Sequence, residues 1–203
     1  MNKLVICGIG TGVGKTVASA IFCRALSADY WKPIQSGDLD HSDAAHIGKW
    51  VDFQGFRVFP EAYRLKTPAS PHHSAQLEGI SIEIKKLVFP KSKKPLIIEP
   101  AGGLMVPLSD NVLFIDWIRE TNLPVVLVSN YYLGSINHTL LSVELLKAKG
   151  ISIKGLVMNG ERVDSTFEAI TRFSGLPCLL EVGQEDEINE KIISKYANRL
   201  NFH

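Results

Sequence analysis

The fold is decided within Leu4-Val5-Ile6-Cys7-Gly8-Ile9-Gly10-Thr11-Gly12-Val13-Gly14-Lys15-Thr16, where an apolar run leads into a glycine-rich turn that ends in Gly-Lys-Thr. A helical pattern follows, and this order of strand, loop and helix is typical of a phosphate-binding loop. Glycines let the backbone curl so that several N–H groups face one anion, and the helix N-terminus adds partial positive charge. We therefore expect Lys15 to reach the β- and γ-phosphates of a nucleotide and Thr16 to bind Mg²⁺.

The spacing of this loop departs from the usual pattern. Ile9 occupies the place of the first glycine, and Gly8 stands one residue earlier, so we interpret the loop as a lengthened variant. A glycine-rich turn that binds nothing is the alternative. The order of strand, loop, Lys-Thr and helix disfavours that alternative.

Length and composition narrow the class of protein. The 203 residues predict one domain over residues 1–203, and the apolar fraction of 45% is ordinary for a globular chain. A net charge of +1 gives no sign of a nucleic-acid surface, and no apolar stretch approaches the ~20 residues of a membrane span. The first strand is expected in the core rather than in a signal peptide, which predicts a cytoplasmic location. Three scattered cysteines indicate small core residues rather than disulfides or a zinc site.

Short apolar runs alternate with helical patterns along the chain, which predicts an α/β fold with a mostly parallel sheet covered by helices on both faces. In such sheets ligands bind beyond the carboxyl ends of the strands. Residues 38–94 are expected to hold loops and one or two helices, and 187–200 an amphipathic helix packed on the sheet, with a membrane-binding tail as the alternative. The expected strands are 3–7, 96–98, 125–129, 156–159 and 179–182, and the expected helices are 15–27, 112–121 and 136–149.

Two acidic residues are candidate ligands for Mg²⁺, which prefers oxygen ligands. Glu99 directly follows the buried strand 96–98, where phosphate-loop enzymes place an acidic residue, although a solvated loop carboxylate is the alternative. Asp43 is either a metal ligand or a charge at a helix N-terminus. The sequence leaves both alternatives open.

Lys32 stands between a short apolar run and Pro33, which favours an extended backbone at the lysine. A lysine in a short strand that runs into Ser36-Gly37 suggests a side chain directed at an anion, and a surface lysine is the alternative. His72 and His73 are expected to be loop histidines rather than a metal pair, because adjacent residues do not share a helix face.

These motifs together resemble the dethiobiotin synthetase family. The resemblance covers roughly residues 3–160 and rests on segments in the family's order: residues 10–17, Lys32-Pro33-Ile34-Gln35-Ser36-Gly37, Ser42-Asp43-Ala44, Ser70-Pro71-His72, Glu99-Pro100-Ala101-Gly102-Gly103, Pro107-Leu108-Ser109-Asp110 and Leu133-Gly134-Ser135-Ile136-Asn137-His138.

The resemblance implies a single-domain P-loop NTPase-like fold and an ATP- and Mg²⁺-dependent cyclo-ligase. Such an enzyme closes the ureido ring of dethiobiotin from 7,8-diaminononanoate and CO₂ or bicarbonate. One amine takes up CO₂ as a carbamate, ATP phosphorylates the carbamate, and the second amine displaces phosphate. A homodimer with sites at the interface is implied, because the 134–137 turn comes from the partner subunit.

The resemblance also implies residue roles. Lys32 and Lys15 are the catalytic residues, and Thr16, Asp43 and Glu99 the Mg²⁺ ligands. Thr11, Ser36, Ser135, Ile136 and Asn137 correspond to substrate contacts. The nucleotide-binding set is Gly12, Val13, Gly14, Lys15, Thr16, Val17, Asp43, Glu99, Pro100, Ala101, Gly102, Asn159, Gly160 and Gly183, with Asn159 at the adenine edge.

Three departures and two rival classes accompany this resemblance. The connection between the first helix and the strand before Lys32 is short. Pro100 replaces a common glycine and removes a backbone donor near the phosphates. Residues 181–186 replace the proline-bearing loop that contacts the base, which leaves GTP or CTP open as alternatives to ATP. A partitioning or division-site switch ATPase would carry a second lysine where Gly10 stands, and a ligase acting on a corrinoid precursor would need an added glutaminase domain.

Overall fold

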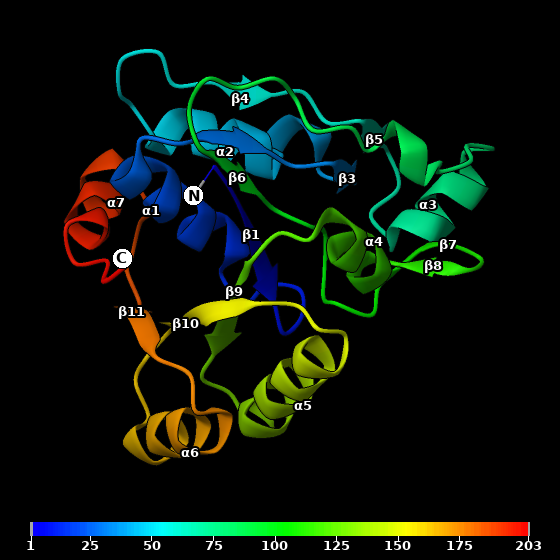
Figure 1. Ribbon diagram of the computed structural model, residues 1–203. Helices are drawn as coiled ribbons and strands as arrows, with labels where there is room; N and C mark the ends of the chain where they lie inside the picture. The colour runs from blue at the N-terminus through cyan, green and yellow to red at the C-terminus, as the bar shows by residue number, and fades with distance from the viewer. Residues whose placement is uncertain (1, 203) are drawn as a thin grey trace.

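A sheet of seven parallel strands forms the centre of the protein, in the spatial order β11-β10-β9-β1-β6-β2-β4. The computed structural model describes residues 2–202 (Figure 1). The strands of this sheet are β1 (Lys3–Gly8), β2 (Asp29–Trp31), β4 (Val58–Phe59), β6 (Leu96–Ile98), β9 (Val125–Asn130), β10 (Ile153–Asn159) and β11 (Cys178–Val182).

Two small sheets lie beside the central one. Parallel strands β3 (Ile34–Ser36) and β5 (Tyr63–Leu65) form the first, and antiparallel strands β7 (Pro107–Ser109) and β8 (Val112–Leu113) form the second. The helices are α1 (Lys15–Leu26), α2 (Asp43–Trp50), α3 (Pro71–Leu77), α4 (Phe114–Thr121), α5 (Ser135–Ala148), α6 (Asp164–Ser174) and α7 (Glu190–Ala197), with single 3₁₀ turns at Leu39–His41 and Ile84–Lys86.

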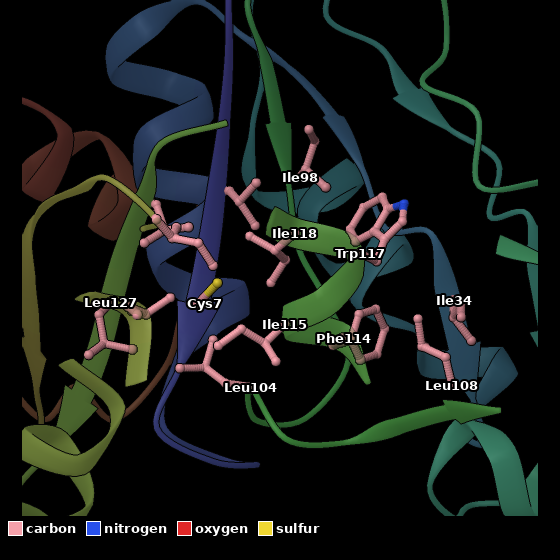
Figure 2. Packing of buried hydrophobic residues seen from close by; sticks show 14 of the residues in the cluster. Cys7, Ile34, Ile98, Leu104, Leu108, Phe114, Ile115, Trp117, Ile118 and Leu127 are labelled. Carbon is pink, nitrogen blue, oxygen red and sulfur yellow. The ribbon is translucent and has the colours of Figure 1, made fainter. Parts of the chain in front are cut away.

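Both faces of the sheet are covered, because successive residues of a strand point to opposite sides. Leu4 and Ile6 of β1 pack with α1, α2 and α7, and α1 contacts α7 directly. Val5 and Cys7 face the other side, where α4, α5 and α6 supply buried residues. Figure 2 shows Ile115 and Ile118 of α4 packed toward Cys7. Strands buried on both faces explain the continuous apolar runs in the sequence.

The glycine loop passes from β1 into α1 through residues that only glycine accommodates easily. Gly14 adopts φ 95° directly before the first helical residue. A Cβ there would lie 2.4 Å from Nδ2 of Asn159, so neither the backbone nor the space allows a side chain. The loop therefore joins β1 to α1 at the carboxyl end of the strand. The N-terminus of α1 lines a cavity at this edge of the sheet.

The predicted α/β fold with a parallel sheet is confirmed, and several boundaries need correction. The helix expected at 112–121 begins only at Phe114, because 112–113 forms β8, and the helix expected at 187–200 spans only Glu190–Ala197. The expectation that His72 and His73 are loop histidines is wrong, since both lie in α3, where Pro71 starts the helix. The short strand expected around Lys32 is divided into β2 and β3, with Lys32 and Pro33 between them, and neither β4 nor α6 was predicted. Within residues 2–202, no helix combines the length and apolar character needed to cross a membrane.

Candidate active site

A cavity of about 740 Å³ lies at the carboxyl ends of β1, β2 and β6, three neighbouring strands of the sheet. The glycine loop and the start of α1 form one wall, and the residues that follow β2 and β6 form the floor. Lys15, Lys32 and Glu99 are the buried charged residues among its lining. The full lining comprises Thr11, Gly12, Gly14, Lys15, Thr16, Val17, Lys32, Gln35, Ser36, Asp43, His46, Trp50, Pro68, Ala69, Ser70, Pro71, Glu99, Ala101, Gly102 and Val106.

Lys15 is the first residue of α1, and its side chain turns back over the loop. Its Nζ donates to the carbonyl oxygen of Gly10 at 2.7 Å. Burial lowers the pKa of Lys15, and the negative charge of Glu99 partly offsets this effect. A cation held over an anion-binding loop by one neutral carbonyl remains available to a phosphate group.

Four side chains converge on the floor of the cavity. Thr16 Oγ1 lies 2.5 Å from Asp43 Oδ1 and 3.0 Å from Glu99 Oε1. Lys32 Nζ donates to Asp43 Oδ2 and lies 3.6 Å from Glu99 Oε1. The arrangement places one ammonium group between two carboxylates at the mouth of the phosphate loop.

The charges of this cluster stabilise one another. Burial alone would lower the pKa of Lys32, but the adjacent carboxylates of Glu99 and Asp43 raise it above its ordinary value. Burial alone would raise the pKa of Asp43, but the charge and hydrogen bond of Lys32 hold it below its ordinary value. The lysine and the aspartate therefore both carry charge at neutral pH.

The oxygens of Thr16, Asp43 and Glu99 fit the donor set that Mg²⁺ prefers. Mg²⁺ in nucleotide sites takes one or two carboxylates together with water and phosphate oxygens. Among residues 2–202, no group of three or more His, Cys, Asp and Glu side chains could hold a metal by itself. Two carboxylates and one hydroxyl beside an anion loop are therefore suited to a cation that arrives with a nucleotide.

Local structure fixes both carboxylates. Asp43 begins α2, whose cap is Ser42, with Oγ accepting from the backbone N–H of Ala45 at 3.3 Å. The two alternatives for Asp43 are therefore compatible, since it is a helix N-terminal charge and also points into the cavity. Glu99 follows β6, and the Tyr30 hydroxyl donates to its Oε2 at 3.0 Å. The sequence did not single out Tyr30, because an apolar strand context hides a buried donor.

The structure brings most of the predicted residues into one cavity. These are Thr11, Gly12, Gly14, Lys15, Thr16, Val17, Lys32, Ser36, Asp43, Glu99, Ala101 and Gly102. Val13 and Pro100 are buried beside the cavity rather than in its lining. Eight predicted residues lie outside the lining: Val13 and Pro100, already named, and Ser135, Ile136, Asn137, Asn159, Gly160 and Gly183.

The residues expected at the adenine edge make contacts within the chain. Asn159 Nδ2 donates to the carbonyl oxygen of Val13 at 3.3 Å, which places the amide beside the phosphate loop. The backbone N–H of Gly183 donates to the Tyr196 hydroxyl at 3.0 Å. One side of the Asn159 amide is therefore committed to the loop, and its oxygen remains for another partner.

Several lining residues were not predicted as site residues. His46 and Trp50 line the cavity and stack with ring centroids 4.9 Å apart. They are four residues apart, so one face of α2 carries both. This spacing is visible in the sequence, but it becomes informative only once a helix is known to start at Asp43. Gln35, Pro68, Ala69, Ser70, Pro71 and Val106 complete the unpredicted lining.

The turn before α5 has the predicted form, but its residues are not part of the lining of this cavity. Gly134 caps the helix with φ 103°, and Ser135 is buried, while Asn137 is exposed. Leu133 is 104% exposed, and Leu141 and Met105 are 61% and 57% exposed. Large apolar side chains therefore stand uncovered around this turn in the single chain.

Sequence comparison now identifies the family. The ATP-dependent dethiobiotin synthetase of Christiangramia forsetii is 45% identical over 96% of this chain and 93% of its own length. Proteins of the same name in Agrobacterium fabrum and Cytophaga hutchinsonii are 44% and 42% identical over at least nine-tenths of this chain. The chain belongs to the dethiobiotin synthetase family. A member of this family is a carbon–nitrogen cyclo-ligase, and the family model of an AAA domain matches residues 2–191.

Solved structures agree on the fold of this dethiobiotin synthetase homologue. A ParA family ATPase from Chlorobium tepidum superimposes with a TM-score of 0.62 at 18% identity, covering 97% of both chains. The cell division ATPase MinD of Pyrococcus furiosus gives a TM-score of 0.57 at 15% identity over 98% of both chains. Such identities bear on the P-loop fold alone, so they lend no support to a partitioning activity for this chain.

Proposed function

We propose that this family member closes the ureido ring of dethiobiotin from 7,8-diaminononanoate, CO₂ and ATP. One amine adds to CO₂ and loses a proton, which gives a carbamate. A carbamate oxygen attacks the γ-phosphorus of ATP and releases ADP, leaving a mixed carbamic–phosphoric anhydride. The second amine attacks the carbonyl carbon, expels phosphate and loses a proton, which closes the cyclic urea. Residues 1–203 act as one domain in this proposal.

The observation that carries the proposal is that Lys15 and Lys32 line the same cavity. Lys15 follows the loop after β1, and Lys32 directly follows β2. Lys15 lies over the phosphate loop, and Lys32 lies on the floor beside Asp43 and Glu99. The reaction must bring together two anions, a carbamate and a terminal phosphate. Cations fixed between them lower the electrostatic cost of the encounter and stabilise the transferring phosphoryl group. Lys15 serves the phosphates, and Lys32 serves the carbamate.

Thr16, Asp43 and Glu99 are the residues that would hold Mg²⁺ here. When bound, the ion would neutralise charge on the β- and γ-phosphate oxygens. Asp43 and Glu99 are oriented for this role by Ser42 and Tyr30, while Thr16 supplies a neutral oxygen from the first turn of α1. The two carboxylates would balance only part of the charge of a divalent cation and the Lys32 ammonium group, and the nucleotide phosphates would balance the rest.

Thr11 and Ser36 are suited to the diamine end of the substrate, because both line the cavity near Lys32. The carboxylate tail would be held by Ser135, Ile136 and Asn137 of a second subunit, in a homodimer. Uncovered apolar side chains around the 134–137 turn support burial of this region against a partner. The N-terminus of α5 carries the partial positive charge of the helix dipole, which suits a carboxylate.

The nucleotide base is expected near Asn159, Gly160 and Gly183. A single amide that is partly committed to Val13 discriminates modestly between bases. We therefore propose ATP as the ordinary co-substrate, with GTP and CTP accepted at comparable efficiency.

Incubation of the purified protein with diaminononanoate, ¹³C-bicarbonate, Mg²⁺ and ATP tests the proposed reaction. Mass spectrometry should find dethiobiotin with ¹³C at the ureido carbon, and ADP and phosphate should form in equal amounts. Omission of the diamine and the Lys32→Ala variant are the controls. ATP hydrolysis that proceeds equally without diamine, with no labelled dethiobiotin, would overturn the proposal and favour a switch ATPase.

A further inference from the structure

The strand pairing brings a buried tyrosine to the carboxylate of Glu99. Tyr30 of β2 pairs with Ile97 of β6, and Glu99 lies two residues beyond Ile97, so its side chain leaves the strand on the same face. Diagonal neighbours of this kind lie within reach of an aromatic side chain. The Tyr30 hydroxyl accordingly donates to Glu99 Oε2 at 3.0 Å, and both residues are at most 1% exposed.

This hydrogen bond places the two carboxylate oxygens of Glu99 in different surroundings. Oε2 points into the protein toward Tyr30, while Oε1 points into the cavity, 3.0 Å from Thr16 Oγ1 and 3.6 Å from Lys32 Nζ. A carboxylate without an inner partner could rotate and present either oxygen, or both, to the cavity. The Tyr30 hydroxyl prevents this rotation, because a rotated carboxylate would lose its buried donor.

We propose that Tyr30 is a positioning residue for the metal site, holding Glu99 so that only Oε1 faces the bound cation. The proposal rests on the proposed metal role of Glu99. Hydrogen-bond partners behind a metal ligand typically change metal affinity by about 10–100-fold when they are removed. Tyr30 is fully buried and is not among the residues that line the cavity, so its effect on the reaction would pass through Glu99.

Manganese binding measures this role without turnover. Mn²⁺ titration of the ADP-bound protein, followed by electron paramagnetic resonance, should show about tenfold weaker Mn²⁺ binding in Tyr30→Phe, at the lower end of the usual range. Binding of ADP without metal should be unchanged. Tyr131→Phe is the matched control, because it also removes a hydroxyl that donates to a glutamate, Glu181, but outside the cavity. The control should bind Mn²⁺ as the natural protein does.

A double-mutant cycle separates positioning from a general structural effect. In a Glu99→Gln background, Tyr30→Phe should cause no further loss of Mn²⁺ affinity, because Tyr30 acts only through the carboxylate. In assays of turnover, raised Mg²⁺ should restore kcat of Tyr30→Phe. Tyr30→Met, which also lacks the hydroxyl, is a second variant and should weaken Mn²⁺ binding in the same way.

The outcomes distinguish the inference from the function on which it rests. If Glu99→Gln leaves Mn²⁺ affinity unchanged, the metal role of Glu99 is wrong. If Glu99→Gln weakens Mn²⁺ binding but folded Tyr30→Phe and Tyr30→Met do not, the positioning role of Tyr30 alone is wrong. If Tyr30→Phe lowers Mn²⁺ affinity equally in the natural and the Glu99→Gln backgrounds, the tyrosine acts on general structure.

Discussion

Removal of the Lys32 ammonium group should destabilise the protein in the absence of metal, in addition to stopping the reaction. Lys32 is 5% exposed and is paired with Asp43 and Glu99, so Lys32→Met leaves two neighbouring carboxylates without their cation. Breaking a buried pair in this way typically costs about 3–5 kcal/mol. The Asp43 side chain is 28% exposed, so water stabilises its charge in part and we expect about 3 kcal/mol, at the lower end of that range.

Urea unfolding in EDTA at neutral pH measures this cost, and the same measurement with MgADP provides the comparison. A divalent cation held by the same carboxylates should remove much of the difference between the variant and the natural protein. Methionine keeps the apolar stem of the lysine, so lost packing contributes little. Equal unfolding free energies of the two proteins in EDTA would refute the view that Lys32 compensates these carboxylates.

The dependence on pH has a definite sign. The pKa of Asp43 lies below its ordinary 3.8 in the folded protein, so its stabilising contribution is present above that value and is lost as pH falls further. The pKa of Lys32 lies above its ordinary 10.5, so its contribution is present below that value and is lost at higher pH. In Lys32→Met the Asp43 carboxyl takes up a proton more readily. The cost of the substitution should therefore be smaller at mildly acidic pH than at pH 8.

Three further predictions concern the reaction. Lys15→Ala should weaken ATP binding and lower kcat/KM by about 10²–10³-fold in a steady-state assay, and near-normal activity would contradict the phosphate-loop role. Asn137→Ala should raise KM for diaminononanoate more than KM for ATP, and mixing it with Lys32→Ala should restore activity through hybrid dimers; no recovery after verified subunit exchange would place each site within one chain. GTP and CTP should support turnover within about tenfold of ATP in kcat/KM, about 1.4 kcal/mol or less, whereas a hundredfold preference for ATP would reveal an adenine pocket that these contacts do not explain.

The sequence predicted those parts of the fold that local pattern controls. Strand β1, the glycine loop and α1 are adjacent in the sequence and were predicted together. Strands β9 and β10 are continuous apolar runs, which are typical of strands in a sheet that is buried on both faces. The short strand β4 was missed, because two residues carry no periodicity. The place of β2 in the sheet is set by pairing with β6, and that of β4 by pairing with β2, and both pairings are long-range properties.

The residues of the candidate site also differ in whether local sequence or long-range contacts determine their place. Lys15 and Thr16 follow from the loop itself, and Glu99 follows from its place after a strand. The contact between Lys32 and Asp43 joins two segments that only the folded sheet brings together, so composition left both residues open and the family resemblance alone suggested their roles. Tyr30 carries no local signal, because its function depends on the register between β2 and β6.

The two lysines of the cavity differ in their partners, and this difference separates their roles. Lys15 is held by the neutral carbonyl of Gly10, and burial lowers its pKa, so its positive charge lacks a close counter-ion until an anion binds. Lys32 lies against Asp43 and Glu99, and their charges raise its pKa against the effect of burial. Loss of Lys15 therefore acts mainly on the affinity for phosphate, because no buried carboxylate is left uncompensated. Loss of Lys32 acts on both the fold and the chemistry, since the same ammonium group balances the carboxylates and faces the carbamate.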